Sequence, residues 1–384
     1  MLLSVCVYTS LAAILFALGW HVWKREERLK AATGRVLPFW SWEIIASILI
    51  FAVVAGARYH TGFDHAMYLH QYVSYQKYGF FTRDFEPLFM WVTQLMAGAH
   101  VHYFFYFAFW AGIEIMALYY ALNKYKHLLP WVSLMLVFGP FYLHLMNTMR
   151  QGVVECFLPL LLVMLSNRKY LLFCGVILLL SLVHETALLL IVLGLVRFKW
   201  NSSVFRKCSV FLFLLATAVG SLPFWLELCR HLTHILMNSS LFQYGNEFSI
   251  NEHHFSVAFG PVRMFVLCCQ LIVLWLSKET LTLFYDNEWM QLIAITAVVF
   301  VVGTALMCNT TNFYQRPFEL FGICFVVLMA ATVSMLLKYD RKILAFIVIA
   351  INLMPLMINL VKATLWPSTS NLPTLYHFFF THYM

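Results

Sequence analysis

Three arginines stand beside the ends of long apolar segments, where each could bind an anion. Arg150 follows Asn147 and precedes Gln151 at the predicted start of a helix. Unpaired backbone N–H groups and the positive end of the helix dipole favour an anion there, and a guanidinium adds a bidentate fork. Arg316 opens another predicted helix, and Arg58 closes an apolar segment. Together they could neutralise a diphosphate, whereas Arg150 alone could equally reach lipid headgroups.

Three other side chains could take a proton from a hydroxyl group. His184 lies at a predicted turn between two short apolar helices, and histidine as a residue type titrates near neutral pH. Such a histidine can also be only a hydrogen-bonded structural residue. Glu86 precedes Pro87 where the chain re-enters an apolar segment, and Asp64 begins a predicted helix. Either carboxylate could be the base or cap a helix N-terminus, and capping is the simpler interpretation for Asp64.

Motifs for metals and cofactors are weak or missing. The pairs His231/His234 and His253/His254 have a spacing compatible with metal ligands, but no carboxylate accompanies them as in HExxH. The sequence has no P-loop, GxGxxG or GxSxG motif. Its nine cysteines lie mostly inside apolar runs, without zinc or disulfide spacing. We therefore expect no metal and no cofactor.

The amino-acid composition indicates the class of protein to which these residues belong. Hydrophobic residues make up 62% of the 384 residues and charged residues 11%, against roughly 45–50% and about 25% in an average soluble protein. The mean hydropathy is +0.79. These values predict an all-α membrane protein with many spans. The net charge of +8 is typical of basic loops on one membrane face, so we expect no nucleic-acid partner.

Apolar segments approach the roughly 20 residues that a spanning helix needs. The stretch 170–196 is predicted as two short helices, and 88–98 as a short helix that does not span. We read 2–23 as a span because it is too apolar and long for a signal peptide. The full set of predicted single spans is 2–23, 39–57, 103–122, 128–146, 150–166, 208–226, 262–277, 289–308, 319–337 and 343–361.

The positive charges set the predicted topology. With 170–196 counted as two helices, six loops fall on one face and hold 17 of the 25 Lys and Arg residues. Positive loops remain in the cytoplasm. We therefore predict about 12 spans in one membrane domain, 1–384, with both termini and the candidate site on the external face.

Two external segments, 58–87 and 227–261, are long enough to have structure. In the first, Tyr68, Tyr72, Tyr75 and Tyr78 recur at helical spacing and share one face. That face could be an interfacial aromatic belt or a stacking surface for sugar rings. The second could select the sugar acceptor or gate a cavity.

Short motifs follow one another in an order that carries a family resemblance. They are Arg58, Gly62-Phe63-Asp64 with Tyr68, Glu86-Pro87-Leu88-Phe89, Asn147-Thr148-Met149-Arg150-Gln151, His184-Glu185-Thr186-Ala187 and Tyr314-Gln315-Arg316. This order resembles the EpsG-like family, which belongs with the Wzy-type O-antigen and exopolysaccharide polymerases of bacterial inner membranes. One departure is Glu185, because a small or polar residue is more usual after the histidine.

The resemblance implies a C-type glycosyltransferase architecture with a cavity open to the periplasm. It implies undecaprenyl-diphosphate-linked oligosaccharides as donor and acceptor, and possible contact with a chain-length regulator. Arg150 and Arg316 would hold the diphosphate, while the Arg58–Asp64 region and His184 would line the site. Because the chain offers arginines and a base but no metal cluster, we expect metal-independent catalysis.

Other functions remain open at the level of sequence. A lipid-linked oligosaccharide flippase would have a similar number of spans, but it would need charges along a path and repeated broken helices. Within spans the acids are Glu43, Glu114 and Glu155, and no Lys or Arg lies mid-span. An O-antigen ligase shares the substrate and differs in its acceptor. An acyltransferase or a non-catalytic assembly component is the remaining alternative.

Overall fold

The computed structural model describes residues 1–62, 64–196, 201–237, 260–284, 287–310, 312–366 and 374–382. Within these ranges all regular structure is helical, apart from an isolated antiparallel bridge between Arg58 and Phe378. The helices are α1 Leu2–Thr33, α2 Trp42–Gly56, α3 His65–Tyr78, α4 Pro87–Gly98, α5 Tyr103–Ala121, η1 Lys126–Leu128, α6 Leu129–Phe138, α7 Phe141–Asn147, α8 Met149–Ser166, α9 Tyr170–Ser181, η2 Glu185–Leu195, α10 Ser202–Val219, α11 Pro223–Met237, α12 Pro261–Trp275, α13 Ser277–Leu283, α14 Glu288–Met307, α15 Asn312–Glu319, α16 Gly322–Lys338, α17 Lys342–Leu365 and η6 Phe379–His382.

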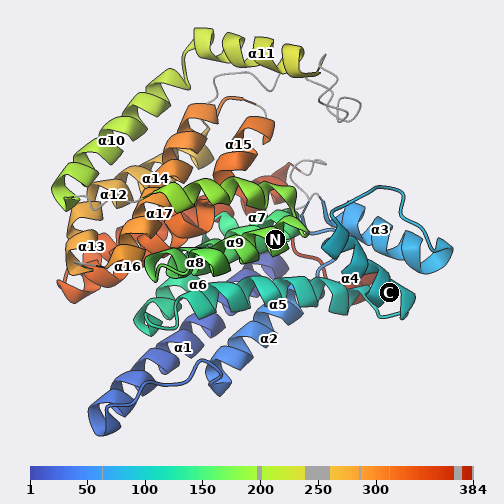
Figure 1. Cartoon of the computed structure of the whole chain (residues 1–384), viewed down its shortest axis with the longest axis horizontal. Helices are drawn as coiled ribbons and strands as arrows, with labels where there is room; N and C mark the ends of the chain where they lie inside the picture. The colour runs from blue at the N-terminus through green and yellow to red at the C-terminus, as the bar shows by residue number, and fades with distance from the viewer. Residues whose placement is uncertain are drawn as a thin grey trace.

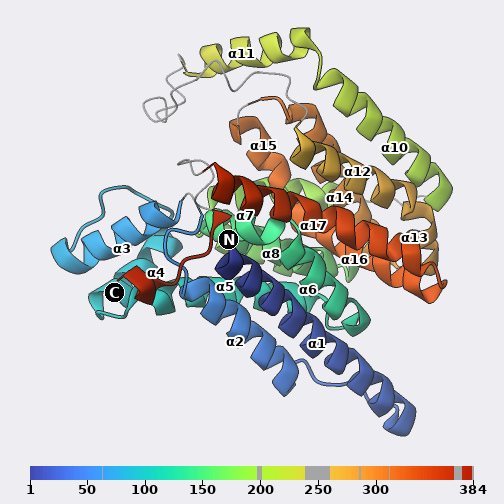
Figure 2. The same cartoon turned by 180° about the vertical axis from the view of Figure 1, so that it is seen from behind.

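Two groups of helices meet around α16, which is apolar on all sides and almost wholly buried. On one side α1 packs on α2 and α6, and α5 packs on α2 and α8. On the other side α16 packs against α14 and α17, and α12 packs along α17. Figures 1 and 2 show these long helices side by side, with α3 and α4 projecting beyond one end of the bundle.

Six described helices are long and apolar enough to cross a membrane, or up to eight candidate spans if each of two bent helix pairs counts as one. The six are α1, α5, α8, α10, α14 and α17. The protein is therefore a helical membrane protein, while about 12 spans and a C-type arrangement stay predictions. The predicted pair of short helices in 170–196 is confirmed as α9 and η2, which meet at residues 182–184.

Three predicted helices differ from the structure. The predicted span 208–226 is not one helix, because α10 ends at Val219 and α11 begins at Pro223. The segment 128–146 is broken into α6 and α7, which meet at 68°, because Pro140 has no N–H with which to continue α6. Arg316 does not open the helix 318–337. It lies inside α15, which ends at Glu319, and a turn closed by the Phe321 N–H and the Phe318 carbonyl (3.0 Å) separates it from α16.

The Lys and Arg residues in the last turns of α1 and in the segments that follow α5, α8 and α16 lie at one end of the bundle, which we call the basic end. Lys126 in η1 pairs with Glu26 in α1 (2.7 Å) and donates to the Leu37 carbonyl (2.9 Å). Arg168 after α8 pairs with Glu288 in α14 (3.0 Å). The contacts of Lys126 tie η1 to α1 and to the segment that follows it, and the Arg168 pair ties the turn after α8 to the start of α14.

The segment 374–382 returns from α17 to the N-terminal helices (Figure 2). The Tyr376 N–H donates to Ser4 Oγ (3.0 Å), and its hydroxyl donates to the Val54 carbonyl (2.5 Å). The Phe379 N–H bonds the Ala57 carbonyl (3.0 Å). This segment thus fixes the chain that leaves α2 and leads toward α3.

Candidate functional site

Glu86 joins a histidine and an arginine from distant parts of the chain. Its Oε1 accepts a hydrogen bond from His184 Nδ1 (2.7 Å), and its Oε2 forms an ion pair with Arg150 Nη1. The Glu185 backbone N–H also donates to Oε1 (3.2 Å). Because an ionised carboxylate only accepts, the His184 proton at this contact is on Nδ1. We call Glu86, Arg150 and His184 the Glu86 cluster.

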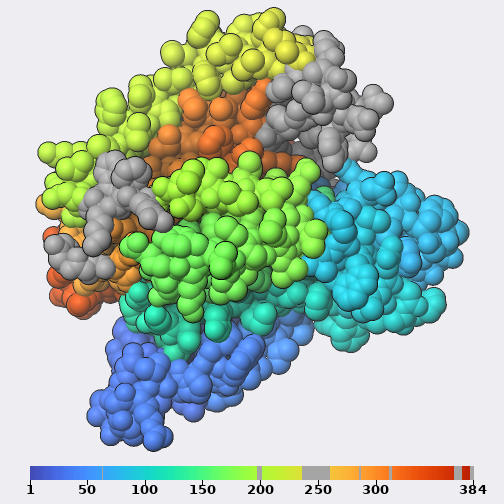
Figure 3. All heavy atoms as spheres, viewed as in Figure 1, coloured from blue at the N-terminus to red at the C-terminus, as the bar shows by residue number. Residues whose placement is uncertain are grey.

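Local backbone structure explains why Glu86 meets His184. Pro87 occupies the first turn of α4, where its missing N–H costs nothing. The next two N–H groups, of Leu88 and Phe89, donate to the Leu182 carbonyl at the end of α9 (2.8 and 3.3 Å). The start of α4 is therefore fastened to the turn that carries His184. The two segments adjoin in Figure 3, cyan beside green.

Arg150 reaches the cluster from the first turn of α8. Its guanidinium lies over the ring of Phe85 (4.4 Å to the centroid), and its Nε is 3.5 Å from the Tyr68 hydroxyl. The side chain is half-buried. Arg150 is thus positioned by aromatic rings and a carboxylate, and its predicted diphosphate contact would use the edge that these partners leave open.

The Glu86 carboxyl is held in its ionised form. Burial acts to raise its pKa, but the hydrogen bond from His184 and the charges of Arg150 and His184 outweigh burial and lower the pKa to about 2. Glu86 is therefore a poor proton acceptor near neutral pH. Its geometry suits a group that orients His184 and neutralises Arg150.

Asp64 lies beside the cluster and differs from Glu86 in its electrostatics. Burial raises the pKa of its carboxyl, and the charges of Arg316, Arg150 and Arg83 oppose that rise. Its backbone N–H donates to Asn147 Oδ1 (2.9 Å). Asp64 stands at the N-cap position of α3 but makes no side-chain capping bond, so the capping interpretation fails and the carboxylate is free for another role.

Arg316 and Gln151 connect α15 to α8. Gln151 Nε2 donates to Glu155 Oε1 (2.8 Å) and contacts the Arg316 carbonyl (3.4 Å). The Arg316 side chain is exposed and makes no ion pair with any residue in the described ranges. Its positive charge still reaches Asp64. The structure therefore brings Asp64, Asn147, Arg150, Gln151 and Arg316 to one neighbourhood.

Arg58 is the predicted site residue that the structure places apart. It is 2% exposed, and its guanidinium donates to the Ala55 and Met146 carbonyls (2.9 and 3.2 Å). It also lies over the ring of Phe107 (4.9 Å). These contacts join α2 to α7, so they support the segment before Asn147 and leave this arginine little access to a substrate.

The tyrosine face of α3 packs inward. Tyr68 and Tyr72 are 3% and 1% exposed, and the Tyr72 hydroxyl donates to the Val101 carbonyl (2.6 Å). Tyr72 also packs on the ring of Tyr106 (4.7 Å between centroids). Only Tyr78, at the last turn of α3, is well exposed. Neither predicted role, an interfacial belt or an open stacking surface, describes the whole face.

A second buried pair lies below the cluster and was missed in the sequence. His144 Nε2 is 2.8 Å from Glu155 Oε1, the same oxygen that Gln151 contacts. Glu155 is fully buried. The available signal was the spacing of Gln151 and Glu155, which are four residues apart on one helix face. This pair holds the corner between α7 and α8.

In the described part of the chain, no group of three or more His, Cys, Asp or Glu residues could hold a metal ion. His231 and His234 lie on α11, whereas His253 and His254 lie outside the described residues. The described site thus offers arginines, carboxylates and an imidazole.

Fold and site together define an all-helical membrane protein with a carboxylate–imidazole–guanidinium cluster beyond one end of its bundle. The EpsG family profile matches residues 42–373. The chain therefore belongs to the EpsG family, a family of Wzy-like polysaccharide polymerases. Comparisons with curated proteins and with solved structures give no match.

Proposed function

We propose that this protein is a bacterial O-antigen or related surface-polysaccharide polymerase of the inner membrane. It transfers a growing glycan from undecaprenyl diphosphate onto the next lipid-linked repeat unit, at the periplasmic face. Family membership supports a polymerase-like glycosyltransferase, and the Glu86 cluster is the observation that carries the chemistry.

His184 is the proposed general base. Glu86 engages its Nδ1 at 2.7 Å, and Nε2 has no hydrogen bond to a described residue. In the reaction, the acceptor hydroxyl oxygen attacks the anomeric carbon while its proton moves to Nε2. The bond from that carbon to the diphosphate oxygen breaks, and the lipid diphosphate leaves with the electron pair. Asp64 is the second candidate base.

Arg150 and Arg316 are proposed to hold the leaving diphosphate. Donors fixed in advance toward developing charge are among the largest contributions to catalysis. Asn147, Gln151 and Tyr68 position these groups, and Arg58 supports them from behind. With two guanidiniums near the leaving group, we propose that no metal is needed. Reversible loss of activity on adding a chelator of divalent cations would contradict that part.

The substrates follow from the proposed reaction. Undecaprenyl-diphosphate-linked oligosaccharide serves as donor and acceptor, membrane lipid surrounds the helices, and a chain-length regulator is a candidate partner. The external segment 227–261 is proposed to contact the acceptor, although 238–259 lies outside the described residues.

Deletion of the gene tests the proposal. Surface polysaccharide and lipid-linked intermediates should be separated from the same culture. If the protein is a polymerase, the deletion strain should carry single repeat units on lipid A-core and no ladder. Long polymer on undecaprenyl diphosphate would indicate a ligase instead, and single units trapped inside the cell would indicate a flippase. Complementation with His21→Ala, a histidine outside the cluster, should restore the ladder.

A further inference from the structure

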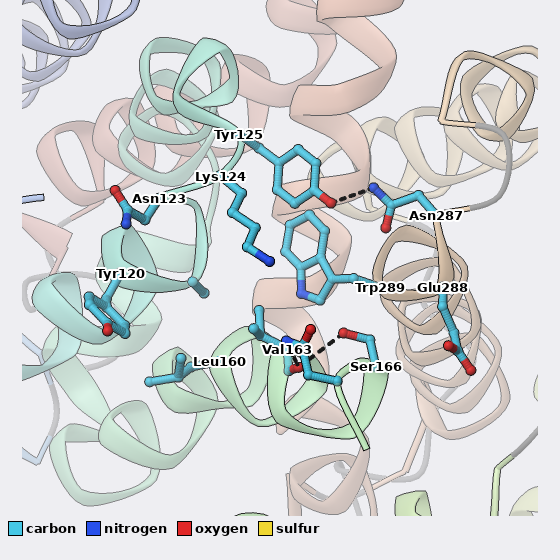
Figure 4. Close-up of a pocket in the computed structure, with 12 residues that line it drawn as sticks. Tyr120, Asn123, Lys124, Tyr125, Leu160, Val163, Ser166, Asn287, Glu288 and Trp289 are labelled. Carbon is cyan, nitrogen blue, oxygen red and sulfur yellow. Dashed lines mark hydrogen bonds between the residues drawn. The ribbon is translucent and has the colours of Figure 1, made fainter. Parts of the chain in front are cut away.

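A cavity of about 520 Å³ lies at the basic end, away from the Glu86 cluster (Figure 4). It is formed by the turn after α5, the last turns of α8 and the start of α14. Leu160 and Ser166 line the cavity 10 and 16 residues after Arg150 on α8, which at 1.5 Å per residue places it roughly 15–25 Å from the cluster along the helix. It is therefore a separate site.

The floor of the cavity is rigid. The rings of Tyr125 and Trp289 stack with centroids 4.6 Å apart and planes 4° from parallel. Asn287 Nδ2 donates to the Tyr125 hydroxyl (2.5 Å), and Trp289 Nε1 donates to the Pro159 carbonyl (3.0 Å). These bonds tie the turn after α5 to the start of α14, and α14 to α8, so both rings are held in place without a ligand.

Lys124 supplies an unpaired positive charge. It is exposed and makes no ion pair or hydrogen bond with the described residues. In Figure 4 its side chain extends between the three elements toward Trp289. The other charged residue that lines the cavity, Glu288, pairs with Arg168 (3.0 Å). The cavity thus suits an anionic group.

The walls are apolar below this charge. Leu160 and Val163 come from α8 and Ala121 from α5, both candidate membrane spans. Tyr120 in the last turn of α5 is 51% exposed, as expected for an aromatic side chain at the level of lipid headgroups. The ligand that fits has a phosphate at one end and an acyl chain at the other.

We propose that this cavity binds an anionic phospholipid, with its phosphate at Lys124 and an acyl chain along Leu160 and Tyr120. The lipid comes from the leaflet that contacts the basic end. This inference does not depend on the proposed polymerase activity, because it concerns the opposite end of the bundle.

Thermal stability of the purified full-length protein in a neutral detergent tests the inference. The probes are dioctanoyl phosphatidylglycerol, dioctanoyl phosphatidylcholine and glycerol 3-phosphate. Phosphatidylglycerol should raise Tm with a saturable dependence on concentration, and the other two should not. Lys124→Ala should lower the apparent affinity by about fivefold, the worth of one lysine near an anionic headgroup. Lys124→Arg should retain most of it.

Lys169→Ala is the matched control, because Lys169 is also exposed at the basic end but does not line the cavity. Its affinity should equal that of the wild type. Equal losses in Lys124→Ala and Lys169→Ala would show general attraction to a basic surface and overturn the site. Equal effects of the two lipids, or no stabilisation by either, would overturn it too. Stabilisation by glycerol 3-phosphate alone would replace the lipid with a soluble anion.

Discussion

The same three residue types form a cluster at each end of this protein. At the basic end, Glu43 contacts His21 and Arg25, each at 2.9 Å. Beyond the other end, Glu86 contacts His184 and Arg150. In the Glu43 trio the histidine and the arginine lie one turn apart on α1 and are 56% and 45% exposed. In the Glu86 cluster they come from separate elements and are 17% and 16% exposed.

The comparison shows that a candidate site differs from a structural ion pair in bringing together side chains from segments that are distant in sequence. The Glu43 trio fastens α1 to α2, and its His21 and Arg25 side chains face solvent. In the Glu86 cluster, Arg150 and His184 lie 64 and 98 residues from the carboxylate in sequence. Three segments must be held together for these groups to meet, so a substrate bound there would contact groups that are already oriented. Matched substitutions in the two trios separate these roles.

The largest difference should come from the histidines. His184→Ala should lower the rate of polymer formation by roughly 10²–10⁴-fold, the usual contribution of a general base. His21→Ala should stay within about twofold, because an exposed ion pair contributes little. The surface-polysaccharide ladder in a deletion strain carrying each variant measures the difference. Equal ladders would remove His184 from the chemistry.

The arginines should differ next. Arg150→Lys keeps the charge but loses the planar fork, so activity should fall by roughly 10²-fold, as for the loss of one donor to a developing charge. Arg25→Lys should leave activity unchanged. Rates on lipid-linked repeat units, normalised to protein in the membrane, give the comparison. Full activity of Arg150→Lys would mean that Arg150 acts only as a point charge.

The carboxylates should give a smaller effect. Glu86→Gln removes the charge that orients His184. Activity should fall about tenfold, as it does on loss of a carboxylate that orients a metal-bound histidine. The loss should appear mainly in kcat, because His184 acts in the chemical step, and any change in KM would come through Arg150, the other partner of Glu86. Glu43→Gln should change neither. A loss confined to KM would instead make Glu86 part of the binding surface.

The smallest effect concerns stability at low pH. The pKa of Glu86 is lowered from 4.5 to about 2 on folding. A depressed carboxyl pKa stabilises the folded state above the unfolded pKa, and this stabilisation is lost as pH falls from about 4.5 toward 2. The Tm gap between wild type and Glu86→Gln should therefore narrow from pH 6 to pH 3 in detergent. A gap that stays constant would contradict the ionised, paired state.

The sequence was sufficient to predict the features that a lipid bilayer requires of a spanning protein. Long apolar runs predict helices, and α5 and α8 follow the predicted segments closely, whereas α1 continues to Thr33, past the predicted end at residue 23. The break at residues 182–184 followed from the charge distribution, because only two short helices in 170–196 keep the basic loops on one face. Arg150 at the start of α8 was predicted from the same boundaries.

Pairing between distant segments could not be predicted. The sequence marks Glu86, Arg150 and His184 as unusual, but the docking of α4 on the end of α9 brings them together. Arg58 is equally marked in sequence, yet it is buried against backbone carbonyls. Periodicity also cannot tell an open tyrosine face from one that packs on Tyr106 and Phe89.

Lys126 gives the same lesson at the basic end. Sequence alone makes it one more loop lysine beside Lys124. The structure buries Lys126 against Glu26 (2.7 Å) and leaves Lys124 at the mouth of a cavity. The two lysines differ in burial, which depends on the folded chain and not on the residues beside them in the sequence.

The central claim is that this chain extends a lipid-linked glycan at the Glu86 cluster. Purified protein reconstituted with undecaprenyl-diphosphate-linked repeat units, without sugar nucleotide or divalent cation, measures this through the length of the products. Wild type and His21→Ala should produce a ladder of lipid-linked chains, and His184→Ala should leave single units. Long chains from His184→Ala, or single units from every preparation, would contradict the account.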